Sequence, residues 1–447
     1  MPSIAYDSAI FRDLFGTPAM REVFSDEGLV ARYVAVEVGL ATAEAAVGVI
    51  PTEAAQAIAS GTDAALIDVA QLKAETDVVG YPIVGIVHQM AKQCGDAGRF
   101  VHWGATTQDI MDTATVLQLR DALALVGADL AAIEVALTGL ARKHRDTVMA
   151  GRTHLQHALP ITFGYKAAVW LSMIRRHRER LGQLGPRVLV AQFSGAAGTL
   201  ASLGDKGLEV QAAFSAELGL KQPDITWHAA RDGVAEAVSF LGLVTGSLAK
   251  IAVDVMLMMQ TEVGEAFEPF VPGRGSSSTM PQKRNPISCE MIAALAKVVR
   301  AQAGLMLDGM AADHERATGP WHIEWIALPQ AFVATSGALY QARFMLEGLI
   351  VEPAAMRRNL DATGGLIVAE AVMMALAPHM GRGAAHDVVY ACCRAALEQG
   401  TPLLDQLRKR SDITRHFDGA ALERLVDPAN YLGVAPAMVD RMVGPGQ

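Results

Sequence analysis

The sequence predicts an almost all-α protein of three helical domains, in which a central bundle of long helices forms a multi-subunit helical core. Proline is absent from long windows, including residues 83–159 and 224–268. These windows are rich in Ala, Leu, Met, Glu and Gln, which favour helix formation. No convincing run of residues alternates apolar and polar side chains, as a half-buried strand would.

The first long helix is expected over residues 109–145. Its apolar residues recur at three- and four-residue spacing, which places them on one helix face. They are Val116, Leu119, Leu123, Val126, Leu130, Ile133, Leu137 and Leu140. Leu117, Leu125 and Val135 lie off this stripe and widen the apolar face.

A second long helix, expected over residues 234–261, is apolar nearly all the way round. Such a helix must be covered on every side. A bundle to which several subunits contribute helices would cover it. Lys250 and Asp254 lie four residues apart on this helix, so we expect them to form an ion pair on its face.

A chain of 447 residues fits two or three domains. We expect an N-terminal helical domain over residues 1–101, a central long-helix bundle over 102–351 and a C-terminal helical domain over 352–447. The second boundary rests on the sequence Val351-Glu352-Pro353 and on the two glycines soon after it.

The composition excludes some classes of partner. Hydrophobic residues make up 51% of the chain and charged residues only 19%, which indicates apolar surface buried between subunits. The net charge of −9 argues against a nucleic acid or an anionic membrane surface. The most apolar stretch, residues 237–249, is shorter than the roughly 20 residues that a bilayer span requires.

The start of the chain carries acidic residues and lacks the basic-then-apolar pattern of a secretion signal. The four cysteines have no metal-ligand spacing, so we expect buried, reduced thiols in a cytoplasmic protein. They are Cys94, Cys289, Cys392 and Cys393.

Residues 272–286 are the most informative segment. The segment combines glycines, serines, prolines and cations without apolar periodicity, so it is a loop. Its backbone N–H groups, hydroxyls and positive charges could hold a small polycarboxylate and stabilise a developing anion.

This loop resembles the signature loop of the fumarase/aspartase superfamily, Gly-Ser-Ser-x-Met-Pro-x-Lys-x-Asn. The matching residues are Ser277, Ser278, Met280, Pro281, Lys283 and Asn285. Ser276 stands where the family has Gly. We expect this difference to alter the mobility of the loop, because Gly adopts backbone angles that Ser avoids.

A second polar cluster, residues 101–109, precedes the first long helix. It contains Thr106, Thr107 and Asp109, which are good helix caps. Such a helix N-terminus could also bind a carboxylate. The cluster resembles the His-x-Gly-x-Thr-Ser-x-Asp segment of adenylosuccinate lyases and carboxymuconate cycloisomerases, with Thr107 in place of Ser. The resemblance implies that Thr106 and Thr107 hold a substrate carboxylate.

A third cluster, residues 151–160, is expected in a break between two helices. A lone histidine such as His154 is more often structural than catalytic. The segment, however, resembles the Thr-His-x-Gln-x-Ala-x-Pro region of the superfamily's lyases. The resemblance implies that His154 is the general acid and that Thr153 and Gln156 contact the substrate.

Two further segments complete the resemblance. Arg231, just before the apolar helix, matches the Arg of an Arg-Asp pair that helps to bind substrate. Residues 314–325 hold two His and two Glu, but their spacing does not build one ligand face, so no metal site is expected. This stretch is similar to carboxymuconate cycloisomerases in particular, and that similarity extends over nearly the whole chain.

The resemblance implies removal of a proton next to a carboxylate, followed by loss of a group from the neighbouring carbon, or the reverse addition. Ser278 is the expected base, with Lys283 and loop amides stabilising its alkoxide. Asn285 and the two threonines would stabilise the enediolate. Ser277 and Met280 are expected to line the bound substrate. No cofactor is implied.

The resemblance leaves two reactions open. The sequence as a whole favours a 3-carboxy-cis,cis-muconate cycloisomerase of aromatic catabolism. His154 favours a C–N lyase that releases fumarate from an N-succinyl compound, because cycloisomerases often carry Trp there. A non-catalytic oligomerisation scaffold is a third reading, against which the intact Ser278, Lys283 and Asn285 argue. The resemblance also implies a homotetramer in which three subunits build each active site.

Overall fold

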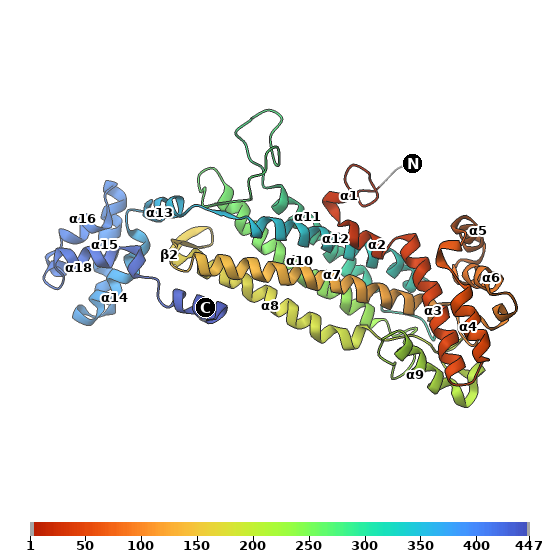
Figure 1. Ribbon diagram of the computed structural model, residues 1–447. Helices are drawn as coiled ribbons and strands as arrows, with labels where there is room; N and C mark the ends of the chain where they lie inside the picture. Colours follow the sequence, from red (N-terminus) through yellow and green to blue (C-terminus); the bar gives the residue numbers. More distant parts are fainter. Residues whose placement is uncertain (1–3, 445–447) are drawn as a thin grey trace. The chain divides into compact units, whose positions relative to one another are not determined.

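The computed structural model describes residues 4–444 (Figure 1). Within this range the chain forms 19 α-helices and only four short strands, so the almost all-α prediction is confirmed. The helices before the first long helix are α1 (Arg12–Phe15), α2 (Pro18–Val23), α3 (Asp26–Ala46), α4 (Thr52–Gly61), α5 (Val69–Val79) and α6 (Ile83–Cys94).

The central part of the chain contains five long helices and one short helix. They are α7 (Thr107–Lys143), α8 (Phe163–Val188), α9 (Gly207–Glu217), α10 (Asp232–Met259), α11 (Ile287–Asp308) and α12 (Pro320–Glu347). The C-terminal helices are α13 (Pro353–Asp361), α14 (Ala369–Met380), α15 (Arg382–Gln399), α16 (Leu403–Arg408), α17 (Ser411–Thr414), α18 (Gly419–Val426) and α19 (Ala435–Val443). Short 3-10 turns are η1 (Ala64–Leu66), η2 (Gly95–Phe100), η3 (Ala201–Lys206), η4 (Leu366–Val368) and η5 (Pro428–Asn430).

The chain divides into two compact units. Unit 1 comprises Met1–Leu130, His177–Ala249 and Met291–Gln341, and unit 2 comprises Ala131–Arg176, Lys250–Glu290 and Ala342–Gln447. The predicted N-terminal domain falls in unit 1 and the predicted C-terminal domain in unit 2, whereas the long helices contribute to both. The division into three domains stays a prediction.

The core of unit 1 is built where α3 packs against α4 and α9, with α6 and the start of α7 beside them (Figure 1). Its apolar side chains include Ile86, Met90, Ile110, Phe193 and Phe214, all of which are buried. All eight residues of the predicted stripe on α7 are also buried, at 9% exposure or less. The helical periodicity of the sequence therefore identified the inward face of this helix correctly.

Helix α10 is not covered on every side by its own chain. Leu243, Val253 and Leu257 are 55%, 44% and 38% exposed. The predicted ion pair is confirmed, because Lys250 Nζ lies 2.6 Å from the carboxylate of Asp254. By length and composition alone, α7 and α10 could each cross a membrane, which the sequence analysis did not predict. The sequence analysis ended the apolar stretch before Lys250, whereas a membrane-spanning helix can contain a few charged residues, such as Lys250 and Asp254.

Unit 2 contains a hairpin that the sequence analysis missed. Strand β1 (Val148–Thr153) pairs antiparallel with β2 (Gln156–Thr162), where a break between helices was expected. A second pair joins β3 (Ala266–Phe267) to β4 (Ile350–Val351), also antiparallel. Both pairs are short, so they do not alter the fold class.

The C-terminal helices of unit 2 have an apolar core of their own. Helices α14, α15, α16 and α18 pack together (Figure 1). Their buried residues include Val372, Leu376, Val389, Leu403, Leu407 and Leu422. All four cysteines are free thiols; Cys289 and Cys392 are buried, and Cys94 and Cys393 are partly buried.

Candidate active site

The structure places the candidate residues in three clusters. Thr106, Thr107 and Arg231 belong to unit 1. The other candidates belong to unit 2, where they lie on the β1–β2 hairpin and on the signature loop, residues 272–286. They are Thr153, His154, Gln156, Ser277, Ser278, Met280, Lys283 and Asn285.

The backbone around Thr106 is organised by Asp109, whose side chain is completely buried. One carboxylate oxygen of Asp109 accepts hydrogen bonds from the backbone N–H groups of Thr106 and Gly195, at 3.0 and 2.9 Å. The other oxygen accepts from Ser194 N at 3.0 Å and contacts His228 Nε2 at 2.7 Å. Asp109 is therefore a structural residue that holds the start of α7, and it leaves the threonine hydroxyls for other partners.

The loop before α7 begins at His102, which adopts a left-handed backbone conformation with φ of 63°. His102 Nδ1 lies 2.7 Å from Oε1 of the buried Glu37 on α3. Burial alone would lower the pKa of His102, but the carboxylate of Glu37 outweighs burial and raises that pKa. The pair fixes an unfavourable backbone geometry at the entry to the threonine segment.

Arg316 lies in the segment 314–325, and the sequence analysis did not identify it as a site residue. Its Nη1 donates to Thr106 Oγ1 at 3.3 Å, and its Nε donates to Gln108 Oε1 at 3.1 Å. Its Nη2 is buried without a hydrogen-bond partner. A guanidinium with a spare buried donor beside a threonine hydroxyl is suited to a carboxylate. The signal in the sequence was a cation in a turn-rich segment between two long helices.

Arg231 lies in a buried ionic network, with a side chain only 2% exposed. Its guanidinium donates to both carboxylate oxygens of Asp112, at 2.7 and 2.9 Å, and to both of Glu324, at 2.8 and 2.5 Å. It also lies over the ring of Trp227. Burial alone would lower the pKa of Arg231, but the two carboxylates raise it. These contacts are structural, and a role in substrate binding stays a prediction.

The hairpin in unit 2 presents His154 at its turn. Thr153, the last residue of β1, pairs with Gln156, the first residue of β2. His154 and Leu155 form the two-residue turn with φ of 50° and 63°, as a type I′ turn requires. His154 is exposed, so its imidazole is free to meet a ligand that approaches this turn. The structure thus brings together the three residues predicted for this cluster.

The signature loop consists of a fixed stem and a tip. In the stem, Asn285 N donates to Gly275 O at 2.9 Å, and Ser276 pairs with Arg284 in an antiparallel bridge. Gly275 has φ of 68°, and a Cβ there would lie 2.6 Å from Asn285 O, so only glycine fits.

The tip of the loop, residues 277–283, is held by local turns. Ser277 Oγ accepts from the N–H groups of Thr279 and Met280, at 3.2 and 3.0 Å. Lys283 N donates to Met280 O at 3.1 Å. Ser278, Met280 and Lys283 are exposed, whereas Ser277 and Asn285 are partly buried. The tip therefore displays Ser278 and Lys283 on one short exposed segment.

Ser276, which replaces the family's glycine, fits its position without backbone strain. The left-handed angles of the stem belong to Gly273 and Gly275, at φ of 79° and 68°. Ser276 Oγ donates to Gly273 O at 2.8 Å. The residue thus adds a hydrogen bond to the stem, and its effect on the mobility of the loop stays a prediction.

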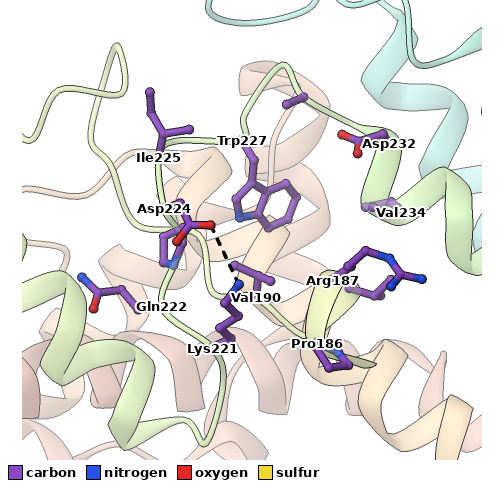
Figure 2. Close-up of a pocket in the computed structure, with 14 residues that line it drawn as sticks. Pro186, Arg187, Val190, Lys221, Gln222, Asp224, Ile225, Trp227, Asp232 and Val234 are labelled. Atoms are coloured by element: carbon purple, nitrogen blue, oxygen red, sulfur yellow. Dashed lines mark ion pairs between the residues drawn. The ribbon is translucent and has the colours of Figure 1, made fainter. Parts of the chain in front are cut away.

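A separate cavity of about 380 Å³ in unit 1 lies beside Trp227, between the end of α8 and the start of α10 (Figure 2). Arg187, Lys221, Asp224 and Asp232 provide its charged groups. Figure 2 shows Lys221 and Asp224 joined by an ion pair, with atoms 3.8 Å apart. None of the candidate residues lines this cavity, so we assign it no part in the chemistry.

Two protein-family models match the chain. The model described as "Lyase" matches residues 15–301, which is more than half of the chain. The model described as "Adenylosuccinate lyase C-terminus" matches residues 365–442. Together they include all three clusters of candidate residues and the separate C-terminal core.

Three similar proteins extend over the full length of the chain. Trans-aconitate decarboxylase 1 of Mycosarcoma maydis is 50% identical over 99% of this chain and 90% of its own. The 3-carboxy-cis,cis-muconate cycloisomerase of Pseudomonas aeruginosa is 47% identical over 97% and 95% of the two chains. The N-acetyl-S-(2-succino)cysteine lyase of Dickeya dadantii is 40% identical over 99% and 98%.

Two solved structures share the fold. A fumarate lyase of Mesorhizobium sp. BNC1 is 54% identical, with a TM-score of 0.91 over 97% of this chain and 99% of its own. The 3-carboxy-cis,cis-muconate lactonizing enzyme of Pseudomonas putida is 44% identical, with a TM-score of 0.93 over 98% of each chain. With these matches in family model, sequence and structure, the chain belongs to the lyase family of the fumarase/aspartase superfamily, as a lyase or cycloisomerase.

Proposed function

We propose that this enzyme is a cycloisomerase of the 3-carboxy-cis,cis-muconate type, which acts on a small polycarboxylate in the breakdown of aromatic compounds. The observation that carries the proposal is the signature loop, where a fixed stem presents Ser278 and Lys283 on an exposed tip. The 47% identity to a cycloisomerase over nearly the full chain supports it.

In the proposed reaction, negative charge develops on the carbon next to a carboxylate and has to be stabilised. In the lactonising direction, a substrate carboxylate oxygen adds to the carbon–carbon double bond, and the electron pair moves to the carbon next to another carboxylate. The Ser278 hydroxyl gives that carbon its proton. In reverse, the Ser278 alkoxide removes the proton and the ring carboxylate leaves. Lys283, Asn285 and loop N–H groups stabilise the enediolate, and Thr106, Thr107 and Arg316 hold a carboxylate.

A second candidate is a lyase that releases fumarate from an N-succinyl or S-succinyl compound. The observation in its favour is His154, exposed at the turn of the hairpin between Thr153 and Gln156. An amine or thiolate leaves more readily when a general acid protonates it. The N-acetyl-S-(2-succino)cysteine lyase relative supports this reading.

A substrate screen tests the proposal. Purified enzyme would be mixed with 3-carboxy-cis,cis-muconate, adenylosuccinate, N-acetyl-S-(2-succino)cysteine and trans-aconitate, and ultraviolet absorbance would follow the conjugated double bonds. We expect turnover of carboxymuconate to give the highest kcat/KM. Highest turnover of a succinyl compound would support the second candidate. If trans-aconitate has the highest turnover, both candidate functions are refuted. The same holds if none of the four compounds is turned over.

His154→Gln separates the two candidates. A ring carboxylate is stable as an anion and leaves without a proton, so turnover of carboxymuconate should be unchanged. Turnover of a succinyl compound should fall by about 10²–10⁴-fold, the usual contribution of a general acid. The measurement is kcat and KM on both substrates, at several pH values. A large loss on carboxymuconate would show that His154 has another role.

The enzyme is further proposed to be a cytoplasmic homotetramer in which three subunits build each active site. Large apolar side chains remain exposed along the long helices, and a second copy of the chain would cover them. They include Val135, Val169, Leu243, Val253, Leu257 and Leu305. This burial also accounts for α7 and α10 being apolar enough to cross a bilayer. The free thiols agree with a reducing compartment.

Mixing two inactive variants tests the shared site. Thr106→Ala disables a cluster of unit 1, and Ser278→Ala disables a cluster of unit 2. If different subunits supply these clusters to one site, hybrids will contain some intact sites. Unfolding and refolding the two variants together should therefore restore part of the activity, while either variant refolded alone stays inactive. Light scattering would give the mass, and a monomeric mass or no restored activity would refute the shared site.

A further inference from the structure

Two buried carboxylates flank β3 in unit 2, and the mechanism above uses neither of them. Glu265 is completely buried and Glu268 is 5% exposed. Burying a carboxylate is costly unless it is paired and hydrogen-bonded. Each of these two has such partners, and some of the partners lie in, or directly after, segments that carry candidate catalytic residues.

Glu265 holds the strand that leads to His154. Arg152 donates to both of its carboxylate oxygens, at 2.6 and 2.8 Å, and Asn359 Nδ2 donates to Oε1 at 2.9 Å. Arg152 lies in β1 directly before Thr153, the last residue of the strand, and His154 follows in the turn. A bidentate pair of hydrogen bonds between a guanidinium and a carboxylate fixes the relative orientation of the two groups as well as their distance.

Glu268 holds the C-terminal end of the signature loop. Its Oε1 accepts from Cys289 N at 2.8 Å, and its Oε2 accepts from Ser288 N at 3.2 Å. These are N–H groups of the first turn of α11, which begins right after the loop. The backbone carbonyl of Glu268 accepts from Arg284 Nη2 at 3.0 Å. One hydrogen bond therefore ties this residue to the loop itself, and two tie it to the first turn of the helix that follows the loop.

The backbone between the two carboxylates is itself fixed. Ala266 and Phe267 pair with Val351 and Ile350 of β4, and Glu352 N donates to Glu265 O at 3.0 Å. Side chains three positions apart on extended backbone point to opposite faces, so a single short strand can serve the hairpin on one side and α11 on the other.

The signature loop has a second anchor close to the first. Arg274 Nη2 donates to Ser288 Oγ at 2.7 Å, and the Arg274 guanidinium lies 4.2 Å from the centre of the Phe344 ring. Ser288 thus ties the loop's N-terminal part to the backbone that Glu268 caps. By contrast, the bonds of the tip around Ser278 are local. The stem is therefore the part of the loop that Glu268 can position.

We propose that the segment Glu265–Glu268 positions two catalytic segments at once: Glu265 fixes the strand that presents His154, and Glu268 fixes the stem that presents Ser278 and Lys283. The inference rests on the proposed function for the roles of Ser278 and Lys283, and on the second candidate function for the role of His154. Glu265 and Glu268 are positioning residues, since each acts through the segment that it holds.

Glu265→Gln and Glu268→Gln test the proposal as a reciprocal pair. Each change keeps the size of the side chain and weakens one set of charge-assisted hydrogen bonds. Trypsin can cut after Lys283 or Arg284 in the loop and after Arg152 in the hairpin. We expect Glu268→Gln to speed cleavage of the loop about tenfold and to leave the rate of hairpin cleavage unchanged. We expect Glu265→Gln to speed cleavage of the hairpin about tenfold and to leave the rate of loop cleavage unchanged.

Kinetics provide the second measurement. With the substrate that the screen identifies, Glu268→Gln should lower kcat more than it changes KM, because the substrate still binds while the catalytic group is misplaced. Glu265→Gln should lower kcat in the same way on a succinyl compound, where His154 is the proposed acid, and should leave turnover of carboxymuconate unchanged. Glu134→Gln is the matched control. Glu134 on α7 forms a 2.8 Å ion pair with Arg175 on α8, so this pair joins two helices of the same unit that are not part of either segment, and kcat and both cleavage rates should stay unchanged.

If Glu265→Gln does not fold, a double variant replaces it in the test. This variant carries Arg152→Met and Glu265→Leu and so removes both charges of the pair together. Its thermal midpoint should approach that of the native enzyme while kcat on a succinyl compound stays low. Equal cleavage of both segments in either single variant, or native cleavage and kcat in both, would overturn the proposal. The cleavage measurement needs no substrate, so a failed substrate screen would refute the proposed function and leave this test intact.

Discussion

Ser278→Ala is expected to lower kcat by about 10³-fold, the usual order for loss of a positioned acid or base. The methyl group cannot carry the proton that the Ser278 hydroxyl is proposed to transfer. KM should change little, because the other groups proposed to hold the substrate remain. The thermal midpoint should be unchanged, because Ser278 is exposed on the tip of the loop.

The measurement is kcat and KM on the substrate from the screen, together with exchange of the substrate's proton in deuterated water. Exchange should stop with turnover, because both depend on the same proton transfer. Ser276→Ala is the matched control, since it removes only the hydrogen bond to Gly273 O and should keep turnover. Full turnover by Ser278→Ala would refute Ser278 as the base and, with it, the proposed mechanism.

Arg231→Met is expected to lower the free energy of unfolding by about 3–5 kcal/mol. Asp112 and Glu324 would be left as buried carboxylates without their shared cation, and their side chains are only 1% and 5% exposed. The loss is large because the penalty of the two unpaired charges adds to the loss of the pairing.

Urea unfolding of Arg231→Met, at fixed protein concentration, measures this loss. A triple variant that also carries Asp112→Asn and Glu324→Gln removes the charges and should recover much of the stability. A single variant with native stability but a raised KM would contradict the structural role. That result would instead support the substrate-binding role that the family resemblance implies for Arg231.

The helices were predictable because their signal is local. The spacing of apolar residues gave the buried face of α7, and the four-residue spacing gave the Lys250–Asp254 pair. The hairpin was missed because its turn is His154-Leu155. A type I′ turn usually carries Asn-Gly, since both residues need positive φ. A histidine and a leucine in those positions give no turn signal in the sequence.

The network around Arg231 could not be predicted, because its partners are distant along the chain. Asp112 lies 119 residues before it and Glu324 lies 93 residues after it. The same holds for Arg316, which meets Thr106 across 210 residues. A motif in the sequence identifies candidate site residues. Only the fold determines whether the charge of an arginine is neutralised by carboxylates of the same chain. Ser278, His154 and Lys283 were identified by resemblance, and their catalytic roles stay predictions.

The uncovered face of α10 has a consequence for how this enzyme behaves when diluted. Leu243, Val253 and Leu257 face solvent in a lone subunit. Association into the proposed tetramer would bury them and stabilise the folded chain by mass action, so the apparent melting temperature would then rise with protein concentration. If the proposed tetramer forms, dilution should separate its subunits, expose these side chains and lower activity, so concentration has to be held fixed when melting temperatures are compared.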